Sequence, residues 1–341
     1  MAELKIKLND YLNKLKVLPK CNKEDLYKWA DYVELKCLAN KDNFYSSNDF
    51  IDDARPRTED LGEGDFEDTE KDKIEGTSRA QKNDKWETLA KETFKIIAFR
   101  QSVFGVYYPF TISANNLSIE LEDTLTTKNK IYLFLLFSSS LQYTIKFKKE
   151  FTSSFEIFSK QVLEKYLPNN ASIKVFGSSN TEEEDDDIVT DSKFWDKLKF
   201  LEEFLNEKLI IEEDDISKYN KGDGGLDIVA KVSMGDSNSH FPIIFGQCAC
   251  SPNEWIVKQS TIKADIWRQK ITLKTIPQYY IFIPQSYRDM SGHWFDKTKI
   301  HETIIIDRQR LVMGYKNEKK FKEYSSYSII EELINIKEEV I

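Results

Sequence analysis

The sequence predicts a protein of the α/β class, with helices and strands mixed (α+β) over two domains. The chain has 341 residues, which is longer than one compact domain of usual size. Its 40% hydrophobic and 13% aromatic residues are enough to form cores, which excludes a wholly disordered chain. Segments with helical apolar spacing alternate with short apolar runs that are typical of strands. We expect an accessory or recognition domain over residues 1–150 and a second domain over residues 151–341.

The first domain is expected to begin with helices and to continue as a sheet. Residues 1–50 carry two groups of apolar residues at helical spacing, and a further helix is predicted from Trp86 to Ala98. The longest apolar run, Ile131–Phe137, has seven residues, which are too few to cross a membrane and predict a buried strand. Three other strands are expected, at Val103–Phe110, Leu117–Leu121 and Leu141–Phe147.

The second domain is expected to alternate helices and strands. Pro168 ends its first helix, because proline removes a backbone donor and clashes with the preceding turn. The expected helices are Ser153–Tyr166, Lys193–Lys208, Glu254–Leu273 and a C-terminal helical extension from Ser328. The expected strands are Ile173–Phe176, Leu226–Val232, Pro242–Ala249, Gln278–Ile283 and Thr303–Ile306.

The charge is unevenly distributed along the chain. With 49 basic and 58 acidic residues the net charge is −9, which excludes a uniformly basic coat for nucleic acid. Residues 51–77 hold eleven acids and four bases, and residues 182–187 are six consecutive acids, so the remainder carries +4. Residues 51–77 also contain one proline, three glycines and few apolar side chains. We expect them to form a flexible acidic segment that masks a basic surface.

The cysteines and histidines favour a reducing compartment and no structural zinc. Four cysteines in so long a chain, at 21, 37, 248 and 250, do not make a disulfide framework. Cys248 and Cys250 have no second pair nearby, and the three histidines lack metal-ligand spacing. The chain does not begin with a secretion signal, and it has no phosphate-loop motif for ATP. A cytoplasmic protein with no membrane partner is expected.

The most informative stretch is the glycine-rich segment Lys221–Ala230 and the strand that follows it. Its three glycines form a turn that can place Asp227 at the mouth of an apolar strand. On the next strand, the period of two puts Gln247 and Ala249 on one face and Cys248 on the other. Asp227 and Gln247 can then lie side by side, and their oxygens could share a hard divalent cation.

These residues resemble the PD-(D/E)xK restriction-endonuclease-like superfamily, and most closely its Mrr-like branch. The resemblance covers about residues 150 to 285 and implies a helix, a small mixed sheet and a second helix. It implies a Mg²⁺ (or Mn²⁺) cofactor, with Asp227 and Gln247 as metal ligands. A carboxylate on the preceding helix completes such sites. Here it would be Glu156, with Glu203 as a substitute.

The sequence departs from the family at one position. Where the family has its lysine, this chain has Ala249, and a methyl group can neither hold a proton nor carry a charge. Either Lys258, on the segment after the strand, supplies the missing amine as a catalytic residue, or the site is inactive. Each residue also has a structural interpretation: Asp227 could cap its turn, Gln247 could be a buried polar residue, and Glu156 could complement the helix dipole.

Residues 255–275 are locally basic and are predicted to bind DNA. Five cations face only Asp265, and Trp255, Ile262, Ile266 and Trp267 supply an apolar stripe. A helix with such a cationic face would contact phosphates, and the alternative is a solvated helix surface. Apart from Lys258, the cations expected to contact the DNA backbone are Lys263, Arg268, Lys270 and Lys274.

The function expected from these patterns is that of a metal-dependent DNA endonuclease. The resemblance implies phosphodiester hydrolysis in a bacterial restriction or antiviral (phage) defence system. The alternative is a catalytically inactive subunit of the same fold, which binds DNA or partner proteins, such as an ATPase or another defence-system subunit. A third alternative is an unrelated α/β interaction protein. The sequence leaves open whether the chain acts alone or as an oligomer.

Overall fold

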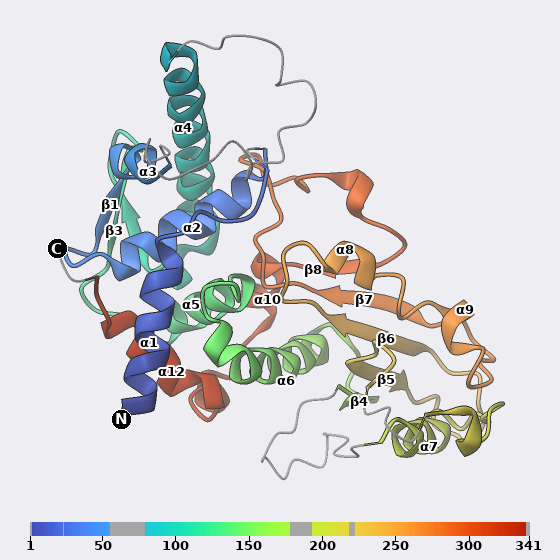
Figure 1. Ribbon diagram of the computed structural model, residues 1–341. Helices are drawn as coiled ribbons and strands as arrows, with labels where there is room; N and C mark the ends of the chain where they lie inside the picture. The colour runs from blue at the N-terminus through green and yellow to red at the C-terminus, as the bar shows by residue number, and fades with distance from the viewer. Residues whose placement is uncertain (1, 23, 55–78, 178–192, 218–221, 339–341) are drawn as a thin grey trace. The chain divides into compact units, whose positions relative to one another are not determined.

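The computed structural model describes residues 2–22, 24–54, 79–177, 193–217 and 222–338. These residues form both helices and sheets, as the predicted α/β class requires (Figure 1). The chain divides into two compact units. The first contains residues 1–126, 288–293 and 332–341, and the second contains residues 127–287 and 294–331. Residues 127–150 therefore lie in the second unit, whereas the sequence placed them in the first domain.

The first unit combines helices with a three-stranded antiparallel sheet. Its strands run in the order β1-β3-β2. Arg100 of α4 is buried and forms ion pairs with Asp31 at 2.7 Å and Glu34 at 2.9 Å, both on α2. The elements are α1 (Ala2–Leu15), α2 (Leu26–Ala39), β1 (Phe44–Ser46), α3 (Ser47–Ala54), α4 (Arg79–Phe104), the 3₁₀ turn η2 (Gly105–Tyr107), β2 (Phe110–Ile112) and β3 (Ser118–Leu121).

The second unit is built on a mixed five-stranded sheet. Its strands are β4 (Ala171–Val175), β5 (Ile228–Val232), β6 (Ile243–Cys248), β7 (Gln278–Phe282) and β8 (Ile304–Ile306), in that spatial order. The pairs β4–β5 and β5–β6 are antiparallel, and β6–β7 and β7–β8 are parallel. The start of β5 therefore lies at the same end of the sheet as the ends of the other four strands. We call this end the Asp227 end.

Helices cover the two faces of this sheet. Helix α6 packs against one face, where Cys248 of β6 lies beside Ser159. On the other face, the α7 residues Leu198, Leu201 and Leu205 share a core with Val229, Phe245 and Trp267. The helices are α5 (Thr127–Ser139), α6 (Lys148–Tyr166), α7 (Phe194–Leu205), α8 (Trp255–Lys258), α9 (Ala264–Trp267), α10 (Arg308–Gly314), α11 (Glu318–Phe321) and α12 (Ser325–Asn335). Three 3₁₀ turns are η3 (Ile145–Phe147), η4 (Glu213–Asp215) and η5 (Lys297–Lys299).

The β-rich prediction for residues 103–149 was wrong in most of its parts. Ile131–Phe137 lies inside α5, and all seven of its residues are buried. Phe134 packs against Phe151 and Phe158 of α6 and against Phe321 of α11, so the helix is covered on several sides. A helix buried all round has no polar face, and its sequence cannot be distinguished from a buried strand by periodicity. Val103–Phe110 is mainly the end of α4 with η2, and Leu141–Phe147 is a turn with η3.

The long helix predicted over residues 254–273 is also absent. The segment forms two single-turn helices, α8 and α9, and Lys263 between them has an extended backbone (φ −68°, ψ 145°). The fully buried Gln259 side chain holds this irregular path, because it donates to the Lys299 carbonyl at 2.9 Å and accepts from the Thr303 hydroxyl at 2.6 Å. These partners lie forty residues away, so local spacing could not reveal them.

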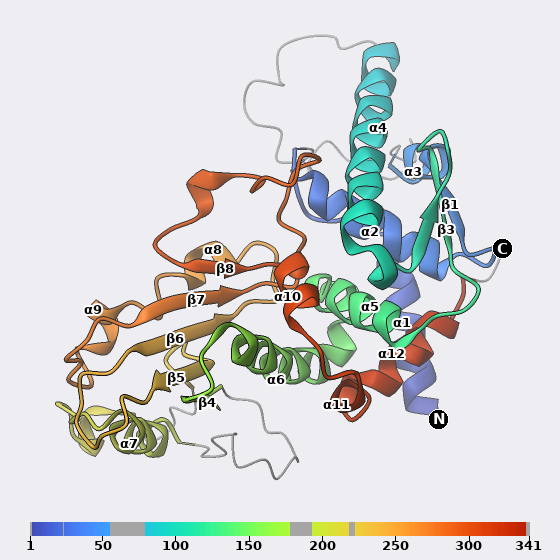
Figure 2. The same cartoon turned by 180° about the vertical axis from the view of Figure 1, so that it is seen from behind.

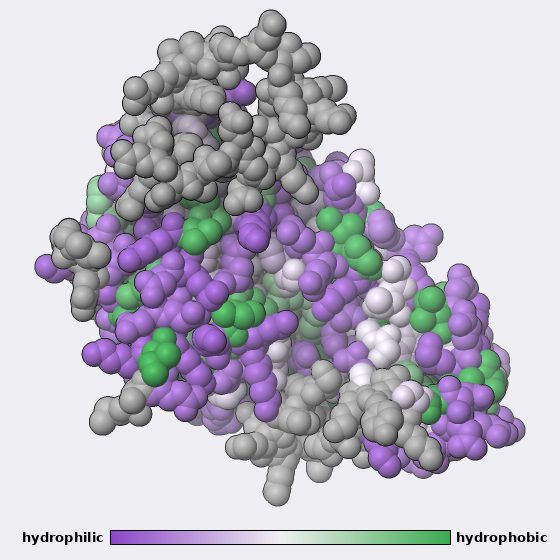
Figure 3. Space-filling model, viewed as in Figure 1, coloured by the Kyte–Doolittle hydropathy of each residue, from purple (hydrophilic) through white to green (hydrophobic). Residues whose placement is uncertain are grey.

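On the face that Figure 3 shows, hydrophilic residues predominate outside the grey regions, and apolar residues gather in small separate groups. No helix within the described residues is long and apolar enough to span a membrane. Of the predicted acidic segment, Ile51–Ala54 forms the end of α3, and residues 55–77 lie outside the described residues. Residues 182–187 also lie outside them.

Candidate functional site

The glycine-rich turn delivers Asp227 to the start of β5. Gly224 and Gly225 have φ angles of +65° and +82°, which glycine adopts without strain. The carboxylate Oδ1 of Asp223 accepts a hydrogen bond from the Gly225 amide at 2.7 Å and closes the turn. A Cβ at Gly225 would lie 2.7 Å from the side chain of Thr261, so the close approach of the two segments also requires glycine.

Hydrogen bonds fix both the backbone and the side chain of Asp227. Its carbonyl accepts from the amides of Phe176 and Gly177, and its own amide donates to the Gly246 carbonyl at 3.0 Å. Its side-chain Oδ2 accepts from Gln247 Nε2 at 2.5 Å and from the Cys248 amide at 2.6 Å. The side chain is almost completely buried, with 5% exposure. The structure thus brings Asp227 and Gln247 together, at the ends of neighbouring antiparallel strands.

Gln247 presents its nitrogen to Asp227, and not its oxygen. The Oε1 atom accepts a hydrogen bond from Thr261 Oγ1 at 3.1 Å instead. A metal ion needs the oxygen. In this arrangement Gln247 is therefore a hydrogen-bond donor to the carboxylate, and half a turn of its amide group would be required to make it a ligand.

Glu156 reaches the same place from α6. A Cβ added to Gly177 would clash with the Glu156 carboxylate, so this carboxylate packs directly against the turn that follows β4. The negative charge of Glu156 also acts on Asp227, as described below. Glu203, the predicted substitute, is exposed on α7 and is not among the charges that act on Asp227.

The electrostatics of Asp227 are unfavourable for its charged form. Burial raises its pKa well above the usual value for an aspartate, and the charges of Glu156 and Asp223 raise it further. The hydrogen bond from the Cys248 amide and the charge of Lys258 act in the opposite direction, and lower the pKa. The buried Asp227 carboxylate thus lies close to the half-buried Glu156, which repels it, and the Lys258 charge offsets part of this repulsion.

Lys258 is the last residue of α8 and is half-buried. Its charge lowers the pKa of both Asp227 and Cys250, although burial keeps the Cys250 pKa raised. Ala249 at the family's lysine position is fully buried, and its amide donates to the Phe282 carbonyl at 2.9 Å. The positive charge that lowers the Asp227 pKa therefore comes from α8 and not from β6.

Lys197 of α7 is a further residue of this region that the sequence analysis missed. Its side chain is 2% exposed, and Nζ donates to the carbonyls of Gly177 at 2.7 Å and Phe176 at 3.2 Å. It therefore holds the turn whose amides bind Asp227 and whose glycine touches Glu156. A signal was present in the sequence, because Lys197 follows Phe194 by three residues and precedes Leu201 by four, on the apolar side of an amphipathic helix.

The cations predicted to bind DNA do not form one helical face. Lys263 forms an ion pair with Glu302 at 3.1 Å and lies over the Tyr279 ring. Lys270 lies over the Trp267 ring, and the exposed Arg268 points a guanidinium nitrogen at the Leu273 carbonyl at 3.5 Å. Lys274 contacts Glu207 and Ser239. Each of the four side chains is engaged within its own unit, and the predicted cationic helix is not present.

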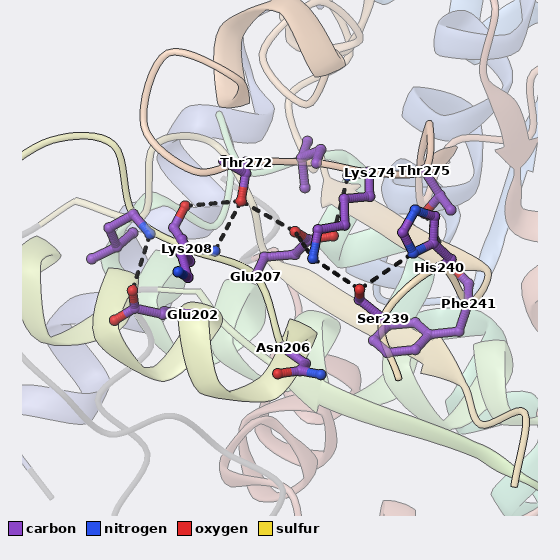
Figure 4. A network of polar contacts seen from close by, with 12 residues as sticks. Glu202, Asn206, Glu207, Lys208, Ser239, His240, Phe241, Thr272, Lys274 and Thr275 are labelled. Atoms are coloured by element: carbon purple, nitrogen blue, oxygen red, sulfur yellow. Dashed lines mark hydrogen bonds and ion pairs between the residues drawn. The ribbon is translucent and has the colours of Figure 1, made fainter. Parts of the chain in front are cut away.

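A second polar cluster lies at the other end of the same sheet (Figure 4). Its centre is the buried Glu207, which accepts hydrogen bonds from Thr272 Oγ1 and from the Lys274 amide, both at 3.1 Å. The Lys274 ammonium lies 3.7 Å from the same carboxylate and donates to Ser239 Oγ at 2.9 Å. This cluster ties the segment after α7 to the segments that precede β6 and β7. We call it the Glu207 cluster.

The residues at the Asp227 end are compatible with a hard divalent cation. Asp227 and Glu156 supply two carboxylates from different elements, and Mg²⁺ is held in proteins by one or two carboxylates while it keeps several waters. Their mutual repulsion would be offset by a bound cation. Within the described residues, no three side chains of the His, Cys, Asp and Glu types converge as a metal cluster. The candidate site thus has two acidic ligands, with Gln247 as a third only after rotation of its amide.

Comparisons of the chain with protein-family models, with curated proteins and with solved structures found no match.

Proposed function

We propose that this chain is a metal-dependent endodeoxyribonuclease that hydrolyses phosphodiester bonds of DNA, as a cytoplasmic component of bacterial restriction or phage defence. One observation carries the proposal. Asp227 and Glu156, which are 71 residues apart in the sequence, meet at one end of a mixed sheet, and the charge of Lys258 acts on the same place. A buried carboxylate close to further negative charge is costly, and such costs concentrate at functional sites.

The order of elements gives further support. Helix α6, the antiparallel strands β4, β5 and β6, and the strand β7 parallel to β6 come in this order along the chain, with α7 between β4 and β5, and the resemblance to the nuclease superfamily implies such a helix and small mixed sheet. The second helix of that core is represented only by the single turns α8 and α9. Because loops and short helices tolerate rearrangement, this difference leaves the positions of Asp227 and Glu156 unaffected.

Each residue would have a distinct role in hydrolysis. Asp227 and Glu156 would hold Mg²⁺ or Mn²⁺, which when bound lowers the pKa of its water and neutralises charge on the phosphate. Lys258 would offset negative charge in the transition state or assist proton transfer. Gln247 would hold the Asp227 carboxylate in its orientation through the bond from Nε2. Lys197 would keep the turn at Gly177 in place.

The alternative is a catalytically inactive nuclease-fold subunit, and a specific observation favours it. The Gln247 amide nitrogen donates a hydrogen bond to Oδ2 of Asp227, where a metal ion would otherwise bind. The buried Ala249 stands at the position of the family's lysine. Such a subunit would bind DNA or a partner protein, such as an ATPase, in a defence complex. It would use the same surface without turnover.

A cleavage assay with separate metal-binding and DNA-binding measurements distinguishes the two functions. Purified protein is incubated with supercoiled plasmid and either Mg²⁺ or Mn²⁺, and Asp227→Asn and Glu156→Gln are compared with wild type. We expect each substitution to lower the cleavage rate by at least about 100-fold, because each removes a ligand of the ion that activates water. Glu203→Gln is the matched control on α7 and should keep full activity.

Three outcomes have different meanings. Loss of cleavage in the two variants but not in Glu203→Gln supports the nuclease. Wild-type protein that binds Mn²⁺ and DNA without cleaving supports the inactive subunit. Cleavage at wild-type rates by Asp227→Asn contradicts the assignment of the site.

A further inference from the structure

A lysine-rich pocket lies in the second unit, away from the carboxylates. It has a volume of about 470 Å³ and is lined by residues of α6 and of the segment from the end of α10 to α11. Figure 2 shows α10 and α11 beside α6. The charged residues of the lining are Lys160, Lys165, Lys316, Lys320 and Glu164, and its neutral polar side chains are Gln161 and Asn317. Four cations and one acid give the lining an excess of positive charge.

Two of these lysines form ion pairs with acids, and two form none within the described residues. Lys160 binds Glu164 at 2.8 Å, one turn along α6, and Lys320 lies 3.3 Å from Glu323. Lys165 and Lys316 are exposed, and neither ammonium forms an ion pair with an acid of the described residues. The single acid of the lining is thus neutralised, and two ammonium groups on opposite walls remain to attract an anion.

The shape of the pocket restricts its ligand. It is a hollow on the surface with a wide mouth, and it is not an enclosed cavity. Its lining offers ammonium groups as point charges, which bind phosphate oxygens without requiring one fixed geometry. A phosphate group on a larger chain fits such an open site, because the rest of the chain can leave through the mouth.

We propose that this pocket is a phosphate-binding subsite for the DNA backbone. This inference rests on the proposed function. Helix α6 carries both the pocket and Glu156, and a rise of 1.5 Å per residue places Lys165 about 14 Å along the helix from Glu156. The pocket would therefore hold a phosphate of the same strand at some distance from the bond that is cleaved. The subsite would position the strand and would not take part in the chemistry.

The test measures DNA binding as a function of salt, in a buffer without divalent cations so that no cleavage occurs. A fluorescent duplex of about 20 base pairs is titrated with wild type and with the double variant Lys165→Ala/Lys316→Ala. Each lost phosphate contact lowers the slope of log K against log[salt] by about 0.9, so we expect a decrease of about 1 to 2. Binding at moderate salt should weaken by about tenfold. Both side chains are exposed, so the melting temperature should not change.

The matched control is Lys319→Ala/Lys322→Ala. Both lysines belong to the same segment and are exposed, but neither lines the pocket. If the control lowers the slope as much as the pocket variant, the effect comes from net charge and the subsite is wrong. An unchanged slope in the pocket variant also overturns it.

A second measurement shows whether the ligand of the pocket is the DNA backbone or a free phosphate compound. It also shows which of the two proposals fails, the nuclease or the phosphate pocket. Pyrophosphate is added to both proteins, and the melting temperature is measured. If wild type fails to bind DNA but is stabilised by pyrophosphate, and the pocket variant is not, the proposed nuclease fails and the phosphate site remains. If neither DNA nor pyrophosphate distinguishes the variant from wild type, the pocket proposal is overturned.

Discussion

Each end of the five-stranded sheet contains a buried carboxylate. The two carboxylates differ in the charged groups and hydrogen-bond donors that surround them. At one end, Glu207 accepts bonds from Thr272 and from the Lys274 amide, and the Lys274 ammonium lies 3.7 Å away (Figure 4). At the other end, the Asp227 carboxylate accepts bonds from the neutral groups of Gln247 and Cys248, and from no cation among the described residues. Glu156 and Asp223 add negative charge there, and Lys258 only partly offsets it.

The difference separates a structural carboxylate from a functional one. The charge of Glu207 is balanced where it lies, so it can stabilise the fold by joining three segments. Among the described residues, more negative than positive charge acts on Asp227, so its burial as a carboxylate lowers stability. A bound divalent cation would supply the missing balance, and this is the physical basis of the proposed site. Four substitutions test the comparison, in order of decreasing expected effect.

Glu207→Ala should have the largest effect on stability. It removes the acceptor of the Lys274 amide and one of the two acceptors of the Thr272 hydroxyl, and the loss of such hydrogen bonds to a buried charged group costs about 2 to 3 kcal/mol. Chemical denaturation with urea measures the free energy of unfolding. Glu203→Ala, an exposed acid on α7, is the control and should change it by less than about 0.5 kcal/mol. An equal loss of unfolding free energy in both variants would contradict a structural role for the Glu207 cluster.

Asp227→Asn should instead stabilise the metal-free protein, by about 1 to 2 kcal/mol at pH 7.5. The asparagine oxygen can still accept from Gln247 and Cys248, and the repulsion by Glu156 is removed. Because burial raises the Asp227 pKa in the folded state, wild type loses stability as the pH rises from about 4 through that raised pKa. The advantage of the variant should therefore disappear on acidification. Urea denaturation at several pH values measures it, and a variant less stable than wild type at pH 7.5 would contradict the prediction.

Lys197→Met should weaken metal binding by about tenfold. The methionine fills a similar volume but cannot donate to the carbonyls of Phe176 and Gly177, so the turn beside Glu156 loses its support. Calorimetric titration with Mn²⁺ gives the affinity. Lys199→Met, on the exposed side of the same helix, is the control. Equal affinities of Lys197→Met and wild type would show that Lys197 only stabilises the core.

Ser239→Ala should have the smallest effect, a loss of about 0.5 kcal/mol or less. Ser239 accepts one hydrogen bond from the Lys274 ammonium, which is partly exposed and keeps Glu207 as a partner. The change is measured by urea denaturation beside Glu207→Ala. A loss as large as that of Glu207→Ala would mean that the cluster depends on its serine, and not on its buried acid.

The sequence predicted those parts of the fold in which local pattern and environment agree. The strands expected at Leu226–Val232, Pro242–Ala249 and Gln278–Ile283 correspond to β5, β6 and β7, because short apolar runs between turns suit the centre of a sheet. It failed for α5, which is buried on all sides. It failed again at residues 254–273, where the Gln259 side chain binds groups about forty residues away.

The candidate site was predictable to a similar degree. The period of two along β6 and the turn at Gly224 and Gly225 were enough to expect Asp227 beside Gln247. The direction of the Gln247 amide depends on Thr261, and the support of the Gly177 turn depends on Lys197. The spacing of Lys197 from Phe194 and Leu201 indicates that it is buried, but the partners in both contacts are tertiary and local sequence does not encode them. The roles of Lys258 and of Mg²⁺ remain predictions.

The most direct test of the central claim is the melting temperature as a function of Mn²⁺ concentration, in the absence of DNA. A ligand that binds only the folded state stabilises it by about 2.7 kcal/mol at one hundred times its dissociation constant. The account predicts a rise of several degrees for wild type and for Glu203→Gln, and no rise for Asp227→Asn or Glu156→Gln. A Mn²⁺-dependent rise in Asp227→Asn equal to that of wild type would contradict the claim that the buried charge at this end of the sheet is balanced by a metal ion.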